Sequence, residues 1–195
     1  MTIAHCAPQL TRRLFDNGCV AVTTDKQRAV MIRPGASRDA ELVSHMYRHL
    51  SKRSIQLRYG APWQQLPEEL IRDEMARMLD GDPRLTATLI GTIGSGAASS
   101  VVSVAELVQS PSDRTTAEIA LLVRDDYQRE GLGRMLSRMI HEVALARGVR
   151  LLRIYLQAEN VAIMRLIRSL SVRYSAETRR GETTVLIPVE GTFEE

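Results

Sequence analysis

Apolar residues recur along the chain at two spacings, which together predict strands alternating with helices. Short apolar runs bounded by charged or turn-forming residues are typical of buried strands, and they occupy residues 20–23, 29–33, 85–93, 99–108, 117–123, 151–156, 172–176 and 183–189. Apolar residues three and four positions apart indicate amphipathic helices, and this spacing covers residues 37–50, 67–79, 132–147 and 159–170. The order of these elements predicts an α/β protein.

Several residues with restricted conformations mark the expected boundaries. Ser37 is expected to cap the first helix, because a serine hydroxyl at that position accepts a hydrogen bond from the first turn. Pro67 suits the start of the second helix, and Gly148 the position just after the third. The segment between these first two helices, residues 51–66, is expected to be a loop that holds Arg58, Tyr59 and Trp63.

Residues 128–133 read Gln-Arg-Glu-Gly-Leu-Gly and lie between the strand at 117–123 and the helix that follows. Two glycines at a helix start leave backbone N–H groups unpaired and sterically open, which favours an anion such as a phosphate. The third glycine of the dinucleotide-binding pattern is missing, because Leu136 stands in its place, and the Lys-Ser/Thr of a P-loop is missing too. The alternative is a strand-to-helix turn that only needs flexible residues.

The residues around this loop resemble the GNAT superfamily of acyl-CoA-dependent N-acyltransferases. Gln128, Gly131 and Gly133 fill that family's Gln/Arg-x-x-Gly-x-Gly/Ala pattern, and Asn160 matches an Asn on the next helix. The run at residues 117–126 resembles the branch that contains bacterial protein-lysine acetyltransferases.

Residues 31–34 and the helix after them support the same resemblance, which spans about residues 29–189. It implies the GNAT fold, a central mixed and twisted sheet with helices on both faces. It also implies that residues 1–28 are an N-terminal extension, 29–190 the N-acetyltransferase domain and 191–195 a C-terminal tail. Relatives often pair through their terminal strands, so residues 183–189 are expected to offer an edge for a homodimer.

The resemblance further implies that acetyl-CoA is the co-substrate. Its pyrophosphate is expected at the motif residue Gln128 and at the backbone N–H groups of Arg129, Gly131, Leu132, Gly133 and Arg134. Backbone atoms at the end of the preceding strand, from Leu121, Leu122 and Val123, are expected to hold the pantetheine arm. Arg134 and Arg138 lie one turn apart and are further candidates for phosphate contacts. Asn160 has two compatible interpretations, a helix N-cap and a pantetheine contact.

Acyl transfer to an amine needs a base, because a primary amine is almost wholly protonated at neutral pH. Glu118 is the first candidate, since a carboxylate within an apolar strand is costly unless it has a role, and the resemblance puts the catalytic glutamate there. Glu106, in the neighbouring strand, is the second, and both are expected to face one cleft. The alternative for Glu118 is a position facing solvent or an arginine. The N–H of Val123 is expected to stabilise the oxyanion.

The general acid departs from the family pattern. Many members carry a tyrosine seven residues after the asparagine, and here that position is Ile167. Tyr174 is a weak substitute, because a tyrosine in an edge hairpin more often packs. Water or the product's own proton is therefore expected to protonate the thiolate.

Length and composition agree with one cytoplasmic domain. The chain has 195 residues, 44% of them hydrophobic, and no apolar run long enough to cross a membrane. Its N-terminus lacks the charged-then-apolar pattern of a signal peptide. Its net charge of +3 and 4% aromatic content, without a basic block, argue against nucleic-acid binding. Cys6 and Cys19 are expected to be free thiols. His45 and His49 have metal-like spacing but no third ligand, so no metal site is expected.

The sequence thus predicts an N-acetyltransferase that transfers the acetyl group of acetyl-CoA to a primary amine by direct attack. The acceptor is either a protein lysine or a small amine. Two other classes stay open: a non-catalytic acyl-CoA-binding sensor or interaction module, and a phosphate-binding domain unrelated to CoA.

Overall fold

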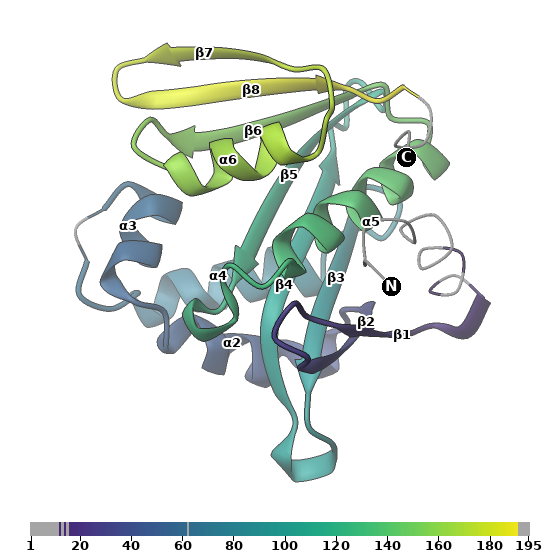
Figure 1. The fold of residues 1–195 in the computed structure, drawn as a ribbon, viewed down its shortest axis with the longest axis vertical. Helices are drawn as coiled ribbons and strands as arrows, with labels where there is room; N and C mark the ends of the chain where they lie inside the picture. Colours follow the sequence, from purple (N-terminus) through teal and green to yellow (C-terminus); the bar gives the residue numbers. More distant parts are fainter. Residues whose placement is uncertain (1–11, 13, 15, 62, 191–195) are drawn as a thin grey trace.

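A computed structural model of the chain describes residues 12, 14, 16–61 and 63–190. Its strands form one eight-stranded sheet in the order β1-β2-β3-β4-β5-β6-β8-β7 (Figure 1). The strands are β1 (Val20–Thr23), β2 (Ala29–Pro34), β3 (Thr86–Ile93), β4 (Ser100–Gln109), β5 (Thr116–Val123), β6 (Leu151–Gln157), β7 (Ser175–Arg179) and β8 (Glu182–Pro188). β5 and β6 pair in parallel, and the other neighbours pair antiparallel. The predicted mixed sheet is confirmed.

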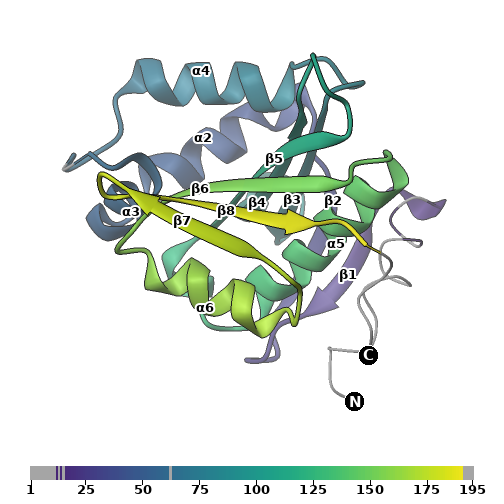
Figure 2. The same cartoon turned by 90° about the horizontal axis from the view of Figure 1, so that it is seen from above.

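Helices cover both faces of the sheet (Figure 2). One face carries α2 (Ala40–Arg48), α3 (Lys52–Tyr59) and α4 (Glu68–Leu79), and the other carries α5 (Leu132–Ala146) and α6 (Val161–Ser169). Each layer has its own core, because strand side chains alternate between the faces. Ile90, Val104 and Leu122 pack with α2 and α4, whereas Leu107 and Leu152 pack with α5.

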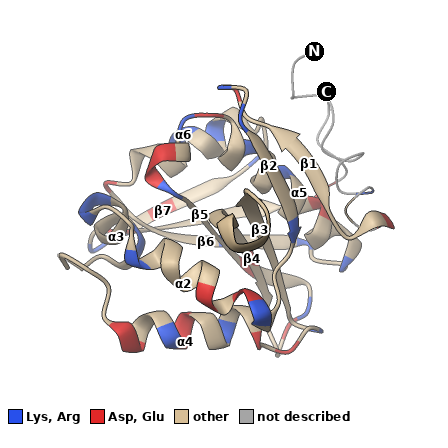
Figure 3. Ribbon diagram, turned by 90° about the horizontal axis from the view of Figure 1, so that it is seen from below, with Lys and Arg blue, Asp and Glu red and all other residues tan. Residues whose placement is uncertain are grey.

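The outer surfaces of the helices are charged. Lysine or arginine and aspartate or glutamate alternate along α2 and α4, while most of the sheet between the layers is uncharged (Figure 3). Such mixing of signs is typical of a solvated helix face. No described helix is long and apolar enough to cross a membrane.

The segment at residues 51–66 was expected to be a loop, and this prediction is wrong over its first half. α3 begins after Ser51, whose hydroxyl accepts a hydrogen bond from the Ser54 amide at 3.2 Å, and it ends at Gly60 with φ of 67°. Both are ordinary helix-ending signals. The helix is short and weakly amphipathic, so its docking depends on contacts far away in sequence.

Two smaller expectations are also corrected. Ser37 does not cap α2; it begins a 3-10 turn, Ser37–Asp39, that leads into the helix. Residues 183–189 do not offer a free edge, because β8 is paired with β6 on one side and with β7 on the other. The edge strand is β7, and its charged residues Glu177 and Arg179 are exposed, as is common where an edge must not aggregate. Cys6 lies outside the described residues, and Cys19 is a free thiol.

An ion pair fastens this 3-10 turn to the end of β2. The guanidinium of Arg33 donates to both oxygens of Asp39, at 2.6 and 2.7 Å, and the Ala36 amide donates to one of them at 3.0 Å. Asp39 is 2% exposed. The hydrogen bond from Arg33, together with that of Ala36, outweighs burial and lowers the pKa of the Asp39 carboxyl.

We expect Asp39→Ala to lower the free energy of unfolding by about 2 kcal/mol at pH 7, because it leaves Arg33 without its partner. Since the folded pKa of Asp39 lies below the unfolded one, its stabilisation is complete above about pH 4 and is lost as the pH falls further. The difference between the two proteins should therefore shrink in acid. Denaturant unfolding at several pH values measures it, with the exposed Asp73→Ala as control. A difference that persists unchanged in acid would contradict the charge assignment.

Candidate functional site

β5 and β6 form a fork in the middle of the sheet. Their ladder runs from Thr116 opposite Leu151 to Glu118 opposite Arg153 and then stops. Beyond that pair the two strands diverge towards α3 (Figure 1). The chain then turns back on either side of the gap, through the loop before α5 and through the start of α6. The fork therefore opens a slot between adjacent strands without breaking the rest of the sheet.

Backbone groups at the end of β5 point into this slot. The amide of Arg124 donates to the carbonyl of Val102 in β4 at 2.8 Å. Alternate residues of an antiparallel strand direct their N–H groups to the same neighbour. The amides of Leu121 and Val123 therefore point away from β4, towards the gap, whereas the amide of Leu122 points to β4. Of the three residues predicted to hold pantetheine, two can present backbone groups to a ligand.

The loop before α5 contains two residues in the left-handed region, Arg129 with φ of 59° and Gly131 with φ of 77°. Gly131 is the N-cap of α5, and no side chain caps this end. The amides of residues 129–134 have no hydrogen-bond acceptor among the described residues. Consecutive N–H groups at the start of a 15-residue helix form a concave site for an anion.

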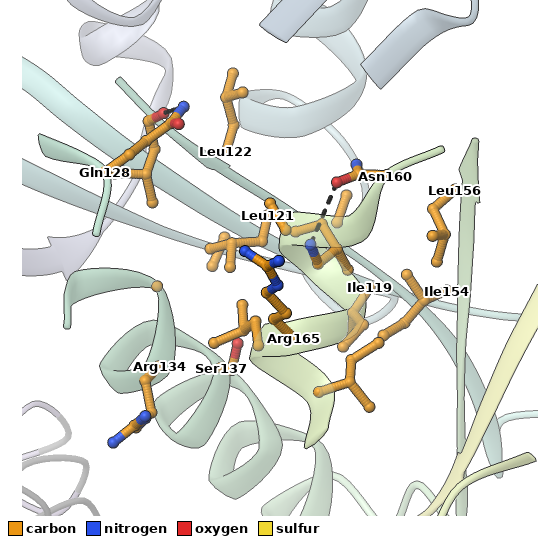
Figure 4. Close-up of a pocket in the computed structure, with 18 of the residues that line it drawn as sticks. Ile119, Leu121, Leu122, Gln128, Arg134, Ser137, Ile154, Leu156, Asn160 and Arg165 are labelled. Carbon is orange, nitrogen blue, oxygen red and sulfur yellow. Dashed lines mark hydrogen bonds between the residues drawn. The ribbon is translucent and has the colours of Figure 1, made fainter. Parts of the chain in front are cut away.

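A cavity of about 700 Å³ joins the fork to this loop. Predicted cofactor residues line it from four places: the end of β5 (Leu121, Leu122, Val123), the loop (Gln128, Arg129, Gly131), the start of α5 (Gly133, Arg134) and Asn160. Figure 4 shows several of these side chains around the space between α5, α6 and the strands. Leu132 is the exception, because its side chain is fully buried in the core. The volume of the cavity suits a cofactor-sized ligand.

The cavity wall is rich in arginine. Arg53 and Arg58 of α3, Arg129, Arg134 and Arg165 line it, against the carboxylates of Asp25 and Asp125. Arginine is well suited to phosphate because its planar group donates two parallel hydrogen bonds. Arg165, on α6, was missed by sequence analysis (Figure 4). Arg138 was expected to contribute, but it is not among the lining residues.

Gln128 braces the loop from within. Its side-chain amide donates to the Val123 carbonyl at 3.0 Å and lies 3.4 Å from the Ser54 hydroxyl. Asp125 holds the start of α3, accepting from the Ser51 and Ser54 hydroxyls at 2.6 and 2.7 Å. Burial raises the pKa of Asp125, but these hydrogen bonds outweigh it and lower the pKa overall. The loop, β5 and α3 are therefore tied together beside the cavity.

Asn160 caps α6. Its side-chain oxygen accepts from the Ile163 amide at 3.2 Å (Figure 4), which confirms the N-cap interpretation. The residue also lines the cavity. The second interpretation, a ligand contact, stays a prediction that this position allows.

The two candidate bases lie on the sheet face that carries α2–α4, but in different surroundings. Glu118 belongs to the last pair before the fork, opposite Arg153, and is exposed. Its side chain makes no hydrogen bond or ion pair with the described residues, and it is not among the residues that line the cavity. Glu106 is 3% exposed and pairs with Arg77 of α4. The expectation that Glu118 and Glu106 face one cleft is therefore wrong, because a small pocket reaches Glu106 and does not reach Glu118.

A polar cluster surrounds Glu106 on this face. A small pocket beside it, lined by Tyr47, Arg58 and Glu106, shares Leu121 and Leu122 with the main cavity. Burial opposes the charge of Arg77, but its contacts with Glu106 and Glu74 outweigh burial and raise its pKa. Burial raises the pKa of Tyr59 to about 12. The Tyr59 phenol therefore stays neutral at physiological pH, whereas Glu106 has a charged partner in Arg77.

Tyr155 of β6 is an exposed aromatic residue on the cavity wall, with a relative exposure of 55%. Trp63 and Tyr59 have ring centroids 6.2 Å apart, but neither is among the residues that line the cavity. Ile167 lines the cavity from α6 as an apolar residue, and Tyr174 packs against the core. Arg58, expected in a loop, lies on α3 and lines the cavity.

Comparison with known proteins agrees with this geometry. The sequence model of the acetyltransferase (GNAT) family matches residues 46–171. The chain therefore belongs to the GNAT family. The match includes α3, the fork, the glycine loop and α6, so the predicted family and its acetyltransferase class are confirmed. No curated protein matches this GNAT chain in sequence.

Solved structures show the same GNAT fold. The GNAT domain of PAT from Streptomyces lividans superimposes with a TM-score of 0.75 and 20% identity, over 88% of this chain and 97% of that one. The Salmonella typhimurium protein yncA, solved with its cofactor acetyl-CoA, gives 0.59 and 19%, over 84% and 95%. A cAMP-binding acyltransferase from Mycobacterium smegmatis gives 0.57 and 19%, over 95% of this chain and 52% of that one. The chain thus spans about half the length of the mycobacterial protein.

Proposed function

We propose that the protein transfers the acetyl group of acetyl-CoA to a primary amine, with Glu118 as the general base. The observation that carries the proposal is the continuity of one cavity from the unpaired amides before α5 to the fork between β5 and β6. A long cofactor with a diphosphate at one end and a thioester at the other fits such a shape. The yncA structure, which contains acetyl-CoA, supports the same assignment.

The start of α5 and the arginines would hold the diphosphate. The unpaired amides supply donors, and the helix dipole favours the negative charge. Gly131 keeps side-chain atoms off the approach to these donors, and Arg134 and Arg165 add charge from two helices. The outward-facing backbone of Leu121 and Val123 would hold the extended arm in the manner of an added strand.

Acetyl-CoA supplies an activated carbonyl and a thiolate leaving group. The chain would supply a place for the amine, a base for its proton and a donor for the charge that grows on the carbonyl oxygen. The amide of Val123 is the donor we assign, because it points into the fork. Position 167, where many family members carry a tyrosine, is Ile167, whose side chain cannot donate a proton. The thiolate would then take a proton from water or from the attacking nitrogen, which must lose its remaining extra proton as the tetrahedral intermediate collapses to the amide.

Glu118 is a better base than Glu106 on structural grounds. Glu106 is buried and already paired with Arg77, and protonating it would leave a charged guanidinium without its partner. Glu118 has no such partner to lose and lies where the strands separate. An amine that approaches from the α2–α4 face would reach the fork beside it. Exposure gives the carboxylate access to solvent, to which it can pass the proton.

The acceptor would be a protein lysine or a small amine entering beside Tyr155, which lines the cavity. The test is release of free CoA thiol from acetyl-CoA in the presence of single primary amines, including lysine-containing peptides, polyamines and amino acids. Amine-dependent release supports the proposal. Tight acetyl-CoA binding without release from any amine would instead favour a non-catalytic sensor, which the apolar Ile167 motivates.

A further inference from the structure

The turn between β1 and β2, residues 24–28, rests on the glycine loop. The amide of Asp25 donates to the carbonyl of Glu130 at 3.0 Å. The hydroxyl of Thr24 and the Nε of Arg28 donate to Oε2 of Glu130 at 3.0 and 2.9 Å. The turn therefore contacts both the backbone and the side chain of the residue that precedes Gly131.

Glu130 is a buried carboxylate with several donors. It is 1% exposed, and Arg28 reaches its second oxygen as well, as does the ammonium of Lys26 at 3.2 Å. Thr24, which supplies the hydroxyl, is fully buried. A buried carboxylate is tolerated where its oxygens are paired and hydrogen-bonded, and this turn supplies all of the side-chain donors that the described residues give Glu130.

Arg28 extends the contact along the segment before the loop. It donates to the carbonyl of Asp126, and its guanidinium lies 3.4 Å from the centroid of the Tyr127 ring. Tyr127 is itself buried. One side chain of the turn thus touches three residues that lead from β5 to α5.

The loop needs such support. Arg129 is a non-glycine residue in the left-handed region, with φ of 59°, directly beside Glu130. Such a conformation costs free energy and persists when the surrounding structure fixes it. Thr24, Asp25 and Arg28 hold the neighbouring Glu130 through its backbone carbonyl and both of its carboxylate oxygens. They therefore hold the following amides in the arrangement that an anion requires.

We infer that Arg28 and Glu130 are positioning residues for the acetyl-CoA site, and that the β1–β2 turn preorganises the pyrophosphate loop. This inference rests on the proposed function. Preorganisation raises affinity because the loop is already ordered before the ligand arrives. The turn lies outside residues 46–171, which match the family model.

Asp25 gives the turn a second, opposite effect. Its side chain lines the cavity, and a Cβ placed on Gly131 would lie 2.9 and 3.0 Å from its two carboxylate oxygens. A negative charge at this distance from the loop opposes a bound diphosphate. The backbone of Asp25 thus supports the loop, while its carboxylate weakens the attraction for the ligand.

The test compares four variants with the unaltered protein: Arg28→Ala, Arg28→Lys, Glu130→Gln and Asp25→Asn. Titration calorimetry gives the Kd of acetyl-CoA, steady-state kinetics give KM and kcat, and hydrogen exchange reports the amides of residues 128–134 without ligand. We expect Arg28→Ala to raise Kd and KM about tenfold, as loss of strongly coupled contacts does, with kcat within about twofold and faster exchange of the loop. Arg28→Lys should recover part of the affinity.

Glu130→Gln keeps the side-chain size and should raise Kd, as Arg28→Ala does. It therefore tests the inference even if Arg28→Ala folds poorly. Asp25→Asn should lower Kd about threefold, as removal of one nearby like charge does. Arg48→Ala, which removes an exposed pair with Glu68, is the control for loss of an arginine. Unchanged Kd and exchange in both Arg28→Ala and Glu130→Gln would overturn this inference alone. Absence of acetyl-CoA binding by the unaltered protein would overturn the proposed function and the inference with it.

Discussion

Glu118→Gln is expected to lower kcat by about a hundredfold or more, the usual contribution of a general base, while the Kd of acetyl-CoA stays unchanged. The substitution keeps the shape of the side chain and removes its ability to accept a proton. The Glu118 side chain is exposed and makes no hydrogen bond or ion pair with the described residues, so stability should not change. Steady-state kinetics with an accepted amine measure kcat, and titration calorimetry measures the Kd of acetyl-CoA.

Glu106→Gln is the matched control for this variant, since it makes the same chemical change one strand away. We expect it to reduce stability, because it weakens a buried pair with Arg77, and to retain most of the activity. The reverse pattern, with an active Glu118→Gln and an inactive but folded Glu106→Gln, would assign the base to Glu106. Full activity in both would remove the glutamate base from the mechanism.

The second large effect is expected from Gly131→Ala, with a Kd for acetyl-CoA raised about a hundredfold, because a misplacement of about 1 Å in a binding loop has effects of this size. Gly131 has φ of 77°, which disfavours any residue with a Cβ, and that Cβ would lie 2.9 Å from the carboxylate of Asp25. The loop would have to move, and its amides would move with it. Calorimetry on the folded variant measures the change.

Gly133→Ala provides the matched control two residues later. Its Cβ would lie 3.6 Å from Leu121 and Leu166, an ordinary packing distance, and its backbone is helical. We expect a Kd within about threefold of the unaltered protein and equal or higher stability, since alanine favours a helix. Equal losses in the two variants would show that the loop tolerates no added methyl group, and the conformational argument for Gly131 would fail.

The spacing of apolar residues predicted most of the helices and strands, because each of these elements must turn an apolar face to the core. The apolar stripe of α5, ended by Gly148 with φ of 72°, and the apolar run of β5 both formed as predicted. α3 was missed because its own pattern is weak. It is held by Asp125, which contacts Ser51 across 74 positions of sequence. The signals that were available, Ser51 and Gly60, are individually common in loops.

The candidate site was predictable in its motif and not in its surroundings. The glycine pattern identified the loop because its conformation demands specific residues. Arg28 and Glu130 lie 102 positions apart in sequence, and neither belongs to a recognisable motif, so their pairing required the folded structure. Glu118 was expected to face one cleft with Glu106, but only the end of the β5–β6 ladder shows that it lies at the fork.

The most direct test is calorimetric titration of the unaltered protein with acetyl-CoA, and with S-acetylpantetheine as a ligand that keeps the thioester arm and lacks the diphosphate. Binding of acetyl-CoA with a Kd of about micromolar order, and of S-acetylpantetheine at least about thirtyfold more weakly, is the expected result, because most of the affinity would come from the loop and the arginines. No binding of acetyl-CoA at millimolar concentration, or equal affinity for the two ligands, would contradict the assignment of the loop as the diphosphate site.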